Sequence, residues 1–240
     1  MNNNTIKLQA FMAHAGVASR RASEKLIEDK RVFVNEKPAH IGQRINPNQD
    51  TVKVNGKTLD KPEKFRYFLV NKPVGYVSTT SDEMGRKNVL DLLPNDINER
   101  LYPVGRLDIE SEGLLLLTND GALAQKLTHP KYKIKKTYHV TVKGTPTFKA
   151  INHLRNGVKL KDGFTKKAGV LVILKEDGET TLEITIFEGR NRQIRRMLER
   201  VGYDTIRLVR VVMGSLDLDM TEGQTVMELN DEQIEDLQNI

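Results

Sequence analysis

Residues 105–121 of this chain are GRLDIESEGLLLLTNDG, a charged loop bounded by glycines and followed by an apolar run. The run 114–117 consists of leucine at every position, which predicts a strand buried on both faces. A loop anchored on such a strand can hold a side chain in a fixed place. The carboxylates of Asp108, Glu110 and Glu112 are therefore candidates for a nucleophile, a general acid or base, or metal ligands; the alternative is a loop of solvated acids.

Many further β-rich stretches surround this segment, with fewer helical patterns between them. Strands are predicted at residues 65–72, 76–79, 114–118, 137–142, 170–174, 182–187 and 205–212. Helices are predicted at residues 122–127, 148–155 and 191–201. Because strict strand–helix alternation is missing, the pattern predicts an α+β domain with a mainly antiparallel, mixed sheet.

The first 60 residues predict a separate small α/β unit. Apolar residues at helical spacing indicate a helix in 8–17, and Ser19 is a suitable N-cap for a second helix that displays Arg20, Arg21 and Lys25. Short strands follow, and Asn55-Gly56 is a strong hairpin signal. Residues 61–64 resemble a linker, so we expect domains at 1–62 and 65–240. The asparagine-rich first residues are expected to be disordered.

The net charge of +6 conceals an uneven distribution of charge along the chain. Residues 217–240 hold eight acids and no lysine or arginine, so residues 1–216 carry 38 basic against 24 acidic residues, a net +14. Residues 188–210 hold seven arginines and three acids. Arginine suits phosphate oxygens and stacks on bases, so this cluster indicates a nucleic-acid surface, although a solvated helix face is the plain alternative.

Composition excludes several classes of protein. The chain has no cysteine, which removes disulfides, thiolate nucleophiles and cysteine-ligated metals. No stretch approaches the ~18 apolar residues of a membrane helix, and the start lacks a secretory signal pattern. The five histidines show no metal-ligand spacing and no phosphate-loop motif occurs, so we expect no metal, no organic cofactor, no membrane partner and a cytoplasmic location.

The segment Gly105–Gly121 closely resembles the catalytic segment of the RsuA-like pseudouridine synthases, which isomerise uridine in ribosomal RNA. Two later strings agree in order and spacing: KTYHV at 136–140 is similar to the family's Lys-x-Tyr-x-Val strand, and EGRNRQIRRM at 188–197 to its late basic motif. Residues 14–21 and 31–35 resemble the alpha-L RNA-binding motif that precedes many members. Glu36 stands where a glycine commonly follows, so we expect an altered turn there.

The resemblance implies a fold and a role for individual residues. It implies a pseudouridine synthase catalytic domain in 65–240, preceded by a small α/β alpha-L-type RNA-binding domain in 1–62. Asp108 would be the catalytic aspartate, either attacking the anomeric carbon or removing a neighbouring sugar proton. Arg195 would be its basic partner, and Tyr138 would stack on the uracil. Glu110 and Glu112 are then structural or solvated.

RNA contacts are also implied by the resemblance. Arg106 would fill the gap left by the extruded uridine, since a stacked nucleotide cannot expose its sugar carbon to a side chain. Further RNA contacts are expected from basic residues of both domains, namely Arg20, Arg21, Lys25, Arg190, Arg192 and Arg196. The expected partner is ribosomal RNA, bound by a monomeric enzyme.

Alternatives from other classes remain. A non-catalytic RNA-binding factor of ribosome assembly would explain the basic surfaces but does not need Asp108, Tyr138 and Arg195. A glycosidase with a carboxylate pair would explain neither the arginine cluster nor the front unit. The form of the late basic motif favours large-subunit over small-subunit ribosomal RNA, and the specific uridine stays open.

Overall fold

The computed structural model describes residues 5–59 and 63–240, and it divides into two compact units. The first comprises Met1–Arg66 with Asn98–Arg100, and the second comprises Tyr67–Ile97 with Leu101–Ile240. The expected boundary at residue 62, two of the four expected linker residues and the first four residues lie outside the described part of the chain. Among the described helices, none is long and apolar enough to cross a membrane.

The first unit packs two helices against short antiparallel strands, as predicted. Its elements are β1 (Ile6–Lys7), α1 (Leu8–His14), α2 (Arg20–Glu28), β2 (Val32–Val34), β3 (Lys37–Pro38), β4 (Arg44–Ile45), β5 (Val52–Val54) and β6 (Lys57–Thr58). The hydroxyl of Ser19 accepts a hydrogen bond from the amide of Ala22, which confirms the predicted N-cap. The core includes Leu8, Met12 and Val32, each fully buried.

Two-residue turns connect both hairpins of this unit. Asn55 and Gly56 have φ of +52° and +80° between β5 and β6, which confirms the predicted hairpin. Asn35 and Glu36 have φ of +49° and +63° between β2 and β3. The turn at Glu36 therefore keeps the two-residue geometry that suits glycine, and the prediction of an altered turn is wrong.

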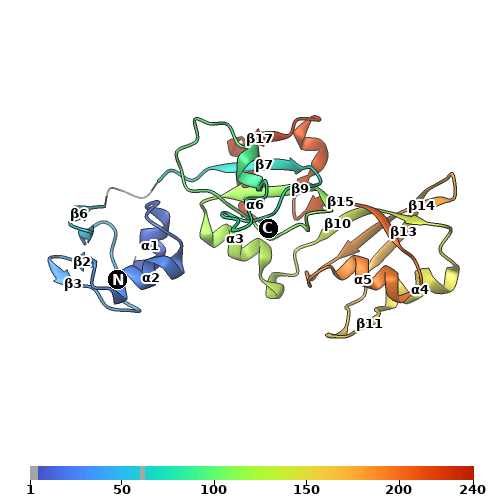
Figure 1. Cartoon of the computed structure of the whole chain (residues 1–240), viewed down its shortest axis with the longest axis horizontal. Coiled ribbons are helices and arrows are strands. Elements are labelled where there is room, and N and C mark those ends of the chain that lie inside the picture. Colours follow the sequence, from blue (N-terminus) through green and yellow to red (C-terminus); the bar gives the residue numbers. More distant parts are fainter. Residues whose placement is uncertain (1–4, 60–62) are drawn as a thin grey trace. The chain divides into compact units, whose positions relative to one another are not determined.

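The second unit is built on one mixed sheet with the order β13-β14-β10-β15-β9-β7-β17 (Figure 1). Its strands are β7 (Tyr67–Lys72), β8 (Tyr102–Pro103), β9 (Glu112–Thr118), β10 (Lys136–Lys143), β13 (Gly169–Glu176), β14 (Glu179–Ile186), β15 (Thr205–Met213), β16 (Leu216–Asp217) and β17 (Val226–Glu228). Every pairing between them is antiparallel except that of β9 with β15. This confirms the predicted mainly antiparallel, mixed sheet. A separate hairpin is formed by β11 (Lys159–Leu160) and β12 (Gly163–Phe164).

Helices cover this sheet on both faces. They are α3 (Gly121–Thr128), α4 (Phe148–Asn156), α5 (Gln193–Arg200) and α6 (Asp231–Gln238), with 3-10 turns η1 (Val89–Leu92), η2 (Pro130–Tyr132) and η3 (Leu218–Thr221). Leu115 and Leu117 of β9 join the core that contains residues of α4 and α5, whereas Leu114 and Leu116 join the core that contains residues of α3 and α6. All four leucines are fully buried, so the prediction of a strand buried on both faces is confirmed.

The end of the opening motif fixes the start of α3. The carboxylate of Asp120 accepts hydrogen bonds from the amides of Ala122 and Leu123 at 3.0 Å, which is an N-cap. The hydroxyl of Tyr67 donates to the same carboxylate at 3.0 Å. Burial, together with the charge of Asp120, raises the pKa of Tyr67 to about 12.

Two local predictions are wrong. Residues 76–79 form no strand, because only an isolated bridge between Val77 and Asn88 is made there. Helix α5 begins at Gln193 rather than at residue 191, because Arg192 has φ of +47°, which interrupts a helix.

Gly113 lies where β9 pairs with β15 in parallel. It is opposite Arg210, with φ of +97°, and a Cβ added there would come within 2.3 Å of the Arg210 carbonyl oxygen and 2.9 Å of its amide nitrogen. Backbone atoms cannot yield as a flexible side chain can. Only glycine therefore permits the close approach that fixes the loop preceding β9.

We expect Gly113→Ala to lower the free energy of unfolding by at least ~2 kcal/mol more than Gly178→Ala. Gly178 has a comparable φ of +77° but open space around its Cβ position, so it controls for backbone strain alone. Urea denaturation of both variants measures the difference. Equal losses of stability would show that the contact with β15 does not limit residue 113.

Candidate active site

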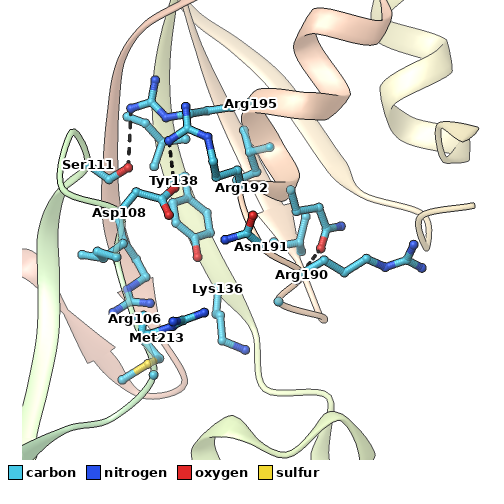
Figure 2. Close-up of a pocket in the computed structure, with 18 of the residues that line it drawn as sticks. Arg106, Asp108, Ser111, Lys136, Tyr138, Arg190, Asn191, Arg192, Arg195 and Met213 are labelled. Atoms are coloured by element: carbon cyan, nitrogen blue, oxygen red, sulfur yellow. Dashed lines mark hydrogen bonds and ion pairs between the residues drawn. The ribbon is translucent and has the colours of Figure 1, made fainter. Parts of the chain in front are cut away.

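A pocket of about 260 Å³ opens in the second unit between the loop before β9, strands β10 and β15 and the turn before α5 (Figure 2). Its polar lining comes from five segments of the chain that the fold brings together. The polar residues that line it are Arg106, Asp108, Ser111, Thr128, Lys136, Tyr138, Arg190, Asn191, Arg192, Gln193, Arg195 and Arg210. The three residues predicted to be catalytic, Asp108, Tyr138 and Arg195, thus lie in one pocket.

The Asp108 loop is held by its own backbone and by a serine from a neighbouring segment. The amide of Ser111 donates to the Asp108 carbonyl at 3.0 Å. The Ser78 hydroxyl donates to the Leu107 carbonyl at 2.9 Å and accepts from the Leu107 amide at 3.1 Å. The Asp108 side chain remains 32% exposed. The carboxylate is therefore positioned by its backbone and is accessible from the pocket.

The ion pair with Asp108 comes from Arg192. Its Nη1 lies 3.8 Å from Oδ2 of Asp108 and donates to both carboxylate oxygens of Glu110, at 3.1 and 2.9 Å. The left-handed backbone of Arg192 lies in the turn before α5, where the Gln193 side chain accepts from the Arg190 amide at 3.1 Å. A non-glycine residue in this conformation costs ~1–2 kcal/mol, a strain that is often found at functional sites.

Arg195 reaches the same loop but not the Asp108 carboxylate. Its Nη2 donates to the Glu110 carbonyl at 3.2 Å and lies 3.5 Å from the Ser111 hydroxyl. The structure therefore gives Asp108 a different ion-pair partner from the one the sequence suggested. One helical turn separates the two arginines, so residue spacing alone does not tell which one faces the carboxylate.

Glu110 and Glu112 are both engaged by arginines. Burial would raise the pKa of Glu110, but backbone hydrogen bonding and Arg192 lower it overall. Arg207 binds both oxygens of Glu112 at 2.9 Å, and these hydrogen bonds lower the pKa of that carboxyl. A general acid needs a raised pKa to hold its proton. Neither glutamate meets that requirement, which argues against the glycosidase alternative.

Tyr138 lies on β10 near two cations, the buried Arg210 and the half-buried Lys136. Tyr138 is only 9% exposed and pairs with Arg210 of β15, where the ladder shifts register between Thr137 and Tyr138. Arg210 is 2% exposed; its Nε donates to the Leu114 carbonyl at 2.7 Å, and its Nη2 has no hydrogen-bond partner in the described part of the chain. Burial and then the charge of Arg210 lower the pKa of Lys136. Tyr138 therefore borders a region of the pocket that favours electron-rich groups.

The residues predicted to contact RNA are found in three different settings. Arg106 is exposed at the pocket, and its side chain makes no hydrogen bond or ion pair within the described part of the chain. Arg190 and Arg192 line the pocket too, whereas Arg196 does not. The remaining three, Arg20, Arg21 and Lys25, are exposed on α2 of the first unit.

Lys72 is a site residue that sequence reasoning missed. It is fully buried at the end of β7, and its Nζ donates to the Ser111 carbonyl at 2.7 Å and to the Pro73 carbonyl at 3.0 Å. Burial lowers the pKa of Lys72 to about 8, although nearby carboxylates including Asp108 oppose the shift. The signal was a lysine inside an otherwise apolar strand pattern. Its bond to Ser111 fixes the loop that carries Asp108.

The pKa of Lys72 predicts a dependence of stability on pH. Below pH 8 the lysine is charged in both the folded and the unfolded chain. Between pH 8 and its ordinary pKa of 10.5 the unfolded chain binds the proton more tightly, so the free energy of unfolding rises with pH. From pH 7 to 10 we expect wild type to gain about 2 kcal/mol relative to Lys72→Met, measured by urea denaturation. A difference that does not vary with pH would contradict this.

Comparisons with known proteins identify the family of both modules. A family model described as RNA pseudouridylate synthase matches residues 66–200, and a model described as S4 domain matches residues 6–51. The chain is 45% identical over 215 residues to ribosomal large subunit pseudouridine synthase B of Bacillus subtilis, with 88% of this chain and 87% of that protein covered. Dual-specificity RNA pseudouridine synthase RluF of Escherichia coli is 36% identical over 237 residues, with 98% and 79% covered.

A solved structure shows that the likeness extends to the fold. A pseudouridylate synthase crystal structure matches with a TM-score of 0.69 at 28% identity, covering 97% of this chain and 99% of that one. The α+β fold and the separate amino-terminal RNA-binding module expected from the sequence are confirmed. By its sequence over both modules and by its fold, the chain belongs to the RsuA-like family of RNA pseudouridine synthases, which are isomerases.

Proposed function

We propose that this enzyme converts a specific uridine of large-subunit ribosomal RNA into pseudouridine, acting as a monomer in the cytoplasm. The name of the Bacillus subtilis relative supports the choice of subunit, as does the form of the basic motif at 188–197. The lack of cysteine agrees with a reducing compartment. Small-subunit ribosomal RNA is the alternative substrate.

The reaction breaks the bond between the sugar and the uracil nitrogen and rejoins the ring through carbon. The anomeric carbon becomes electron-poor as the base leaves, so an ionised carboxylate can attack it or remove a neighbouring sugar proton. Among the described residues Asp108 is the acid that lines the pocket, whereas Glu110 and Glu112 do not line it and are hydrogen-bonded to Arg192 and Arg207. This difference between three neighbouring acids is the observation that carries the assignment.

Arginines orient the aspartate without closing it off. Arg192 lies 3.8 Å from the Asp108 carboxylate, longer than a direct hydrogen bond, so the pair attracts while leaving oxygen lone pairs for the sugar. Arg195 binds the backbone and hydroxyl of the loop that carries Asp108. We assign Arg192 as the ion-pair partner and Arg195 as a positioning residue of the Asp108 loop.

Tyr138 is proposed to bind the uracil ring. Its ring lines the pocket that Asp108 also lines, and Figure 2 shows both side chains directed toward the same hollow. An aromatic face can stack on the base, and its buried position on a sheet strand keeps the ring in place. The base would then stay in the pocket between bond cleavage and rejoining.

Arg106 is proposed to occupy the space that the extruded nucleotide leaves. It precedes Asp108 by two residues and is exposed at the rim, so a uridine that reached Asp108 would place the vacated stack near its guanidinium. A planar guanidinium can stack on bases. This contact would offset part of the few kcal/mol that flipping requires.

A non-catalytic assembly factor is the competing function, and Asp108→Asn separates the two. We expect wild type to form pseudouridine in transcribed large-subunit but not small-subunit ribosomal RNA, without releasing base or sugar. Asp108→Asn keeps the shape of the side chain but should lower the rate of pseudouridine formation by ~10²–10⁴-fold, while RNA affinity is retained. Glu112→Gln, a matched loss of charge at the start of β9 just after that loop, should stay within about tenfold of wild type. Turnover by Asp108→Asn would reject the assignment, and product confined to small-subunit RNA would reject the subunit.

Arg106→Ala should affect structured RNA more than unstructured RNA. If Arg106 fills the vacated stack, the variant should lose roughly 10–100-fold in rate on folded ribosomal RNA, since flipping there requires a few kcal/mol. On a single-stranded oligonucleotide with the same uridine the loss should be no more than about threefold. Single-turnover rates on both substrates give the ratio. A similar loss on both would indicate a role in shaping the loop.

A further inference from the structure

A second hollow, of about 650 Å³, lies in the same unit beside the catalytic pocket's helix. The β11–β12 hairpin and α5 form it, and its lining is Lys159, Leu160, Lys161, Arg196, Glu199 and Arg200. We call it the hairpin groove. Four of its six residues are cations and one is an acid. Its chemistry therefore favours anions.

Arginines at the start of α5 and along it connect the catalytic pocket to the hairpin groove. Arg196 and Arg200 are four residues apart on α5, so they follow one side of the helix, and Arg192 immediately precedes it. Arg192 lines the catalytic pocket, and the other two line the groove. At 1.5 Å per residue α5 spans about 10 Å from Gln193 to Arg200, which matches about three nucleotides of a stacked strand.

The hairpin wall of the groove is fixed to α5 in advance. Arg196 donates through Nη1 and Nη2 to the two carboxylate oxygens of Asp162, at 2.9 and 3.1 Å. Arg190 donates to the carbonyls of Asp162 and Gly163 at 3.2 Å. Two arginines of the late basic motif thus hold the hairpin tip. The groove needs no large rearrangement to accept a ligand.

Three cations of the groove are left for a ligand. Lys159, Lys161 and Arg200 are exposed, and within the described part of the chain their side chains make no hydrogen bond or ion pair. Such unpaired charges repel one another and gain most from a partner with repeated negative charge. A phosphate backbone is such a partner. The RNA strand that holds a nucleotide in the neighbouring pocket would continue from that nucleotide into the groove.

We propose that the hairpin groove binds the RNA phosphate backbone about three nucleotides from the target uridine. Lys159, Lys161 and Arg200 bind phosphates there, and Arg196 with Asp162 holds the wall in place. This proposal rests on the proposed function, because the strand enters the groove from the uridine in the catalytic pocket. Affinity and register come from the groove, while the chemical step remains at Asp108.

The test removes the three free cations together. We expect Lys159→Ala/Lys161→Ala/Arg200→Ala to bind transcribed large-subunit ribosomal RNA roughly 10–100-fold more weakly at 0.1 M salt. A plot of log affinity against log salt should lose about two units of slope, since each of the three phosphate contacts on a single strand contributes about 0.7. The kinetic loss should fall on KM rather than on kcat. Urea denaturation verifies that the variant is folded.

A matched control removes three exposed lysines from elsewhere on the same sheet unit. Lys143 and Lys175 lie at the ends of β10 and β13 remote from the catalytic pocket, and Lys149 lies on α4. We expect Lys143→Ala/Lys149→Ala/Lys175→Ala to bind and react within about twofold of wild type. Equal weakening in both triple variants, or none in the groove variant, would overturn the proposal. A wild-type enzyme that forms no pseudouridine would instead overturn the proposed function.

Discussion

The close parallel contact between β9 and β15 is the constraint on which the active site depends. At Gly113 the backbone of β9 approaches that of Arg210 too closely for any side chain. The loop with Asp108 ends where these two strands pair, and β15 contributes Arg210 to the lining of the same pocket. Four fully buried leucines then hold β9 between two cores. The carboxylate is consequently presented from a loop that leads directly into a buried strand.

Charge in this protein is organised by pairing rather than by total. Arginines at the pocket bind loop acids, as Arg192 does with Glu110, and others fasten segments, as Arg196 does with Asp162. The acidic residues after 216 likewise belong to the fold, because β17 pairs with β7 and Leu237 of α6 is fully buried. Cations of this unit thus fall into two groups: some bind acids of the fold, as Arg192 and Arg196 do, and others are exposed and unpaired within the described residues, as Lys159 and Arg200 are.

Sequence patterns could predict what depends on local order. Leucine at 114–117, the Asn55-Gly56 turn and the Ser19 cap each specify their structure through neighbouring residues. Features set by distant contacts could not be predicted. Residues 76–79 have β-rich composition but form only an isolated bridge, and the burial of Lys72 depends on a carbonyl of the loop before β9. The choice of Arg192 over Arg195 as the Asp108 partner follows from one left-handed residue, which helical periodicity does not reveal.

The position of β7 in the sheet has a consequence for how the chain folds. One edge of β7 pairs with β9, and the other pairs with β17, which follows more than 150 residues later in the sequence. Pairing between such distant segments forms slowly, because a long loop must close first. Until residues 226–228 arrive, a strand with four buried apolar residues presents an open edge. While the chain is being synthesised, β7, the first strand of the catalytic sheet, therefore has an open edge that can pair with other chains and aggregate.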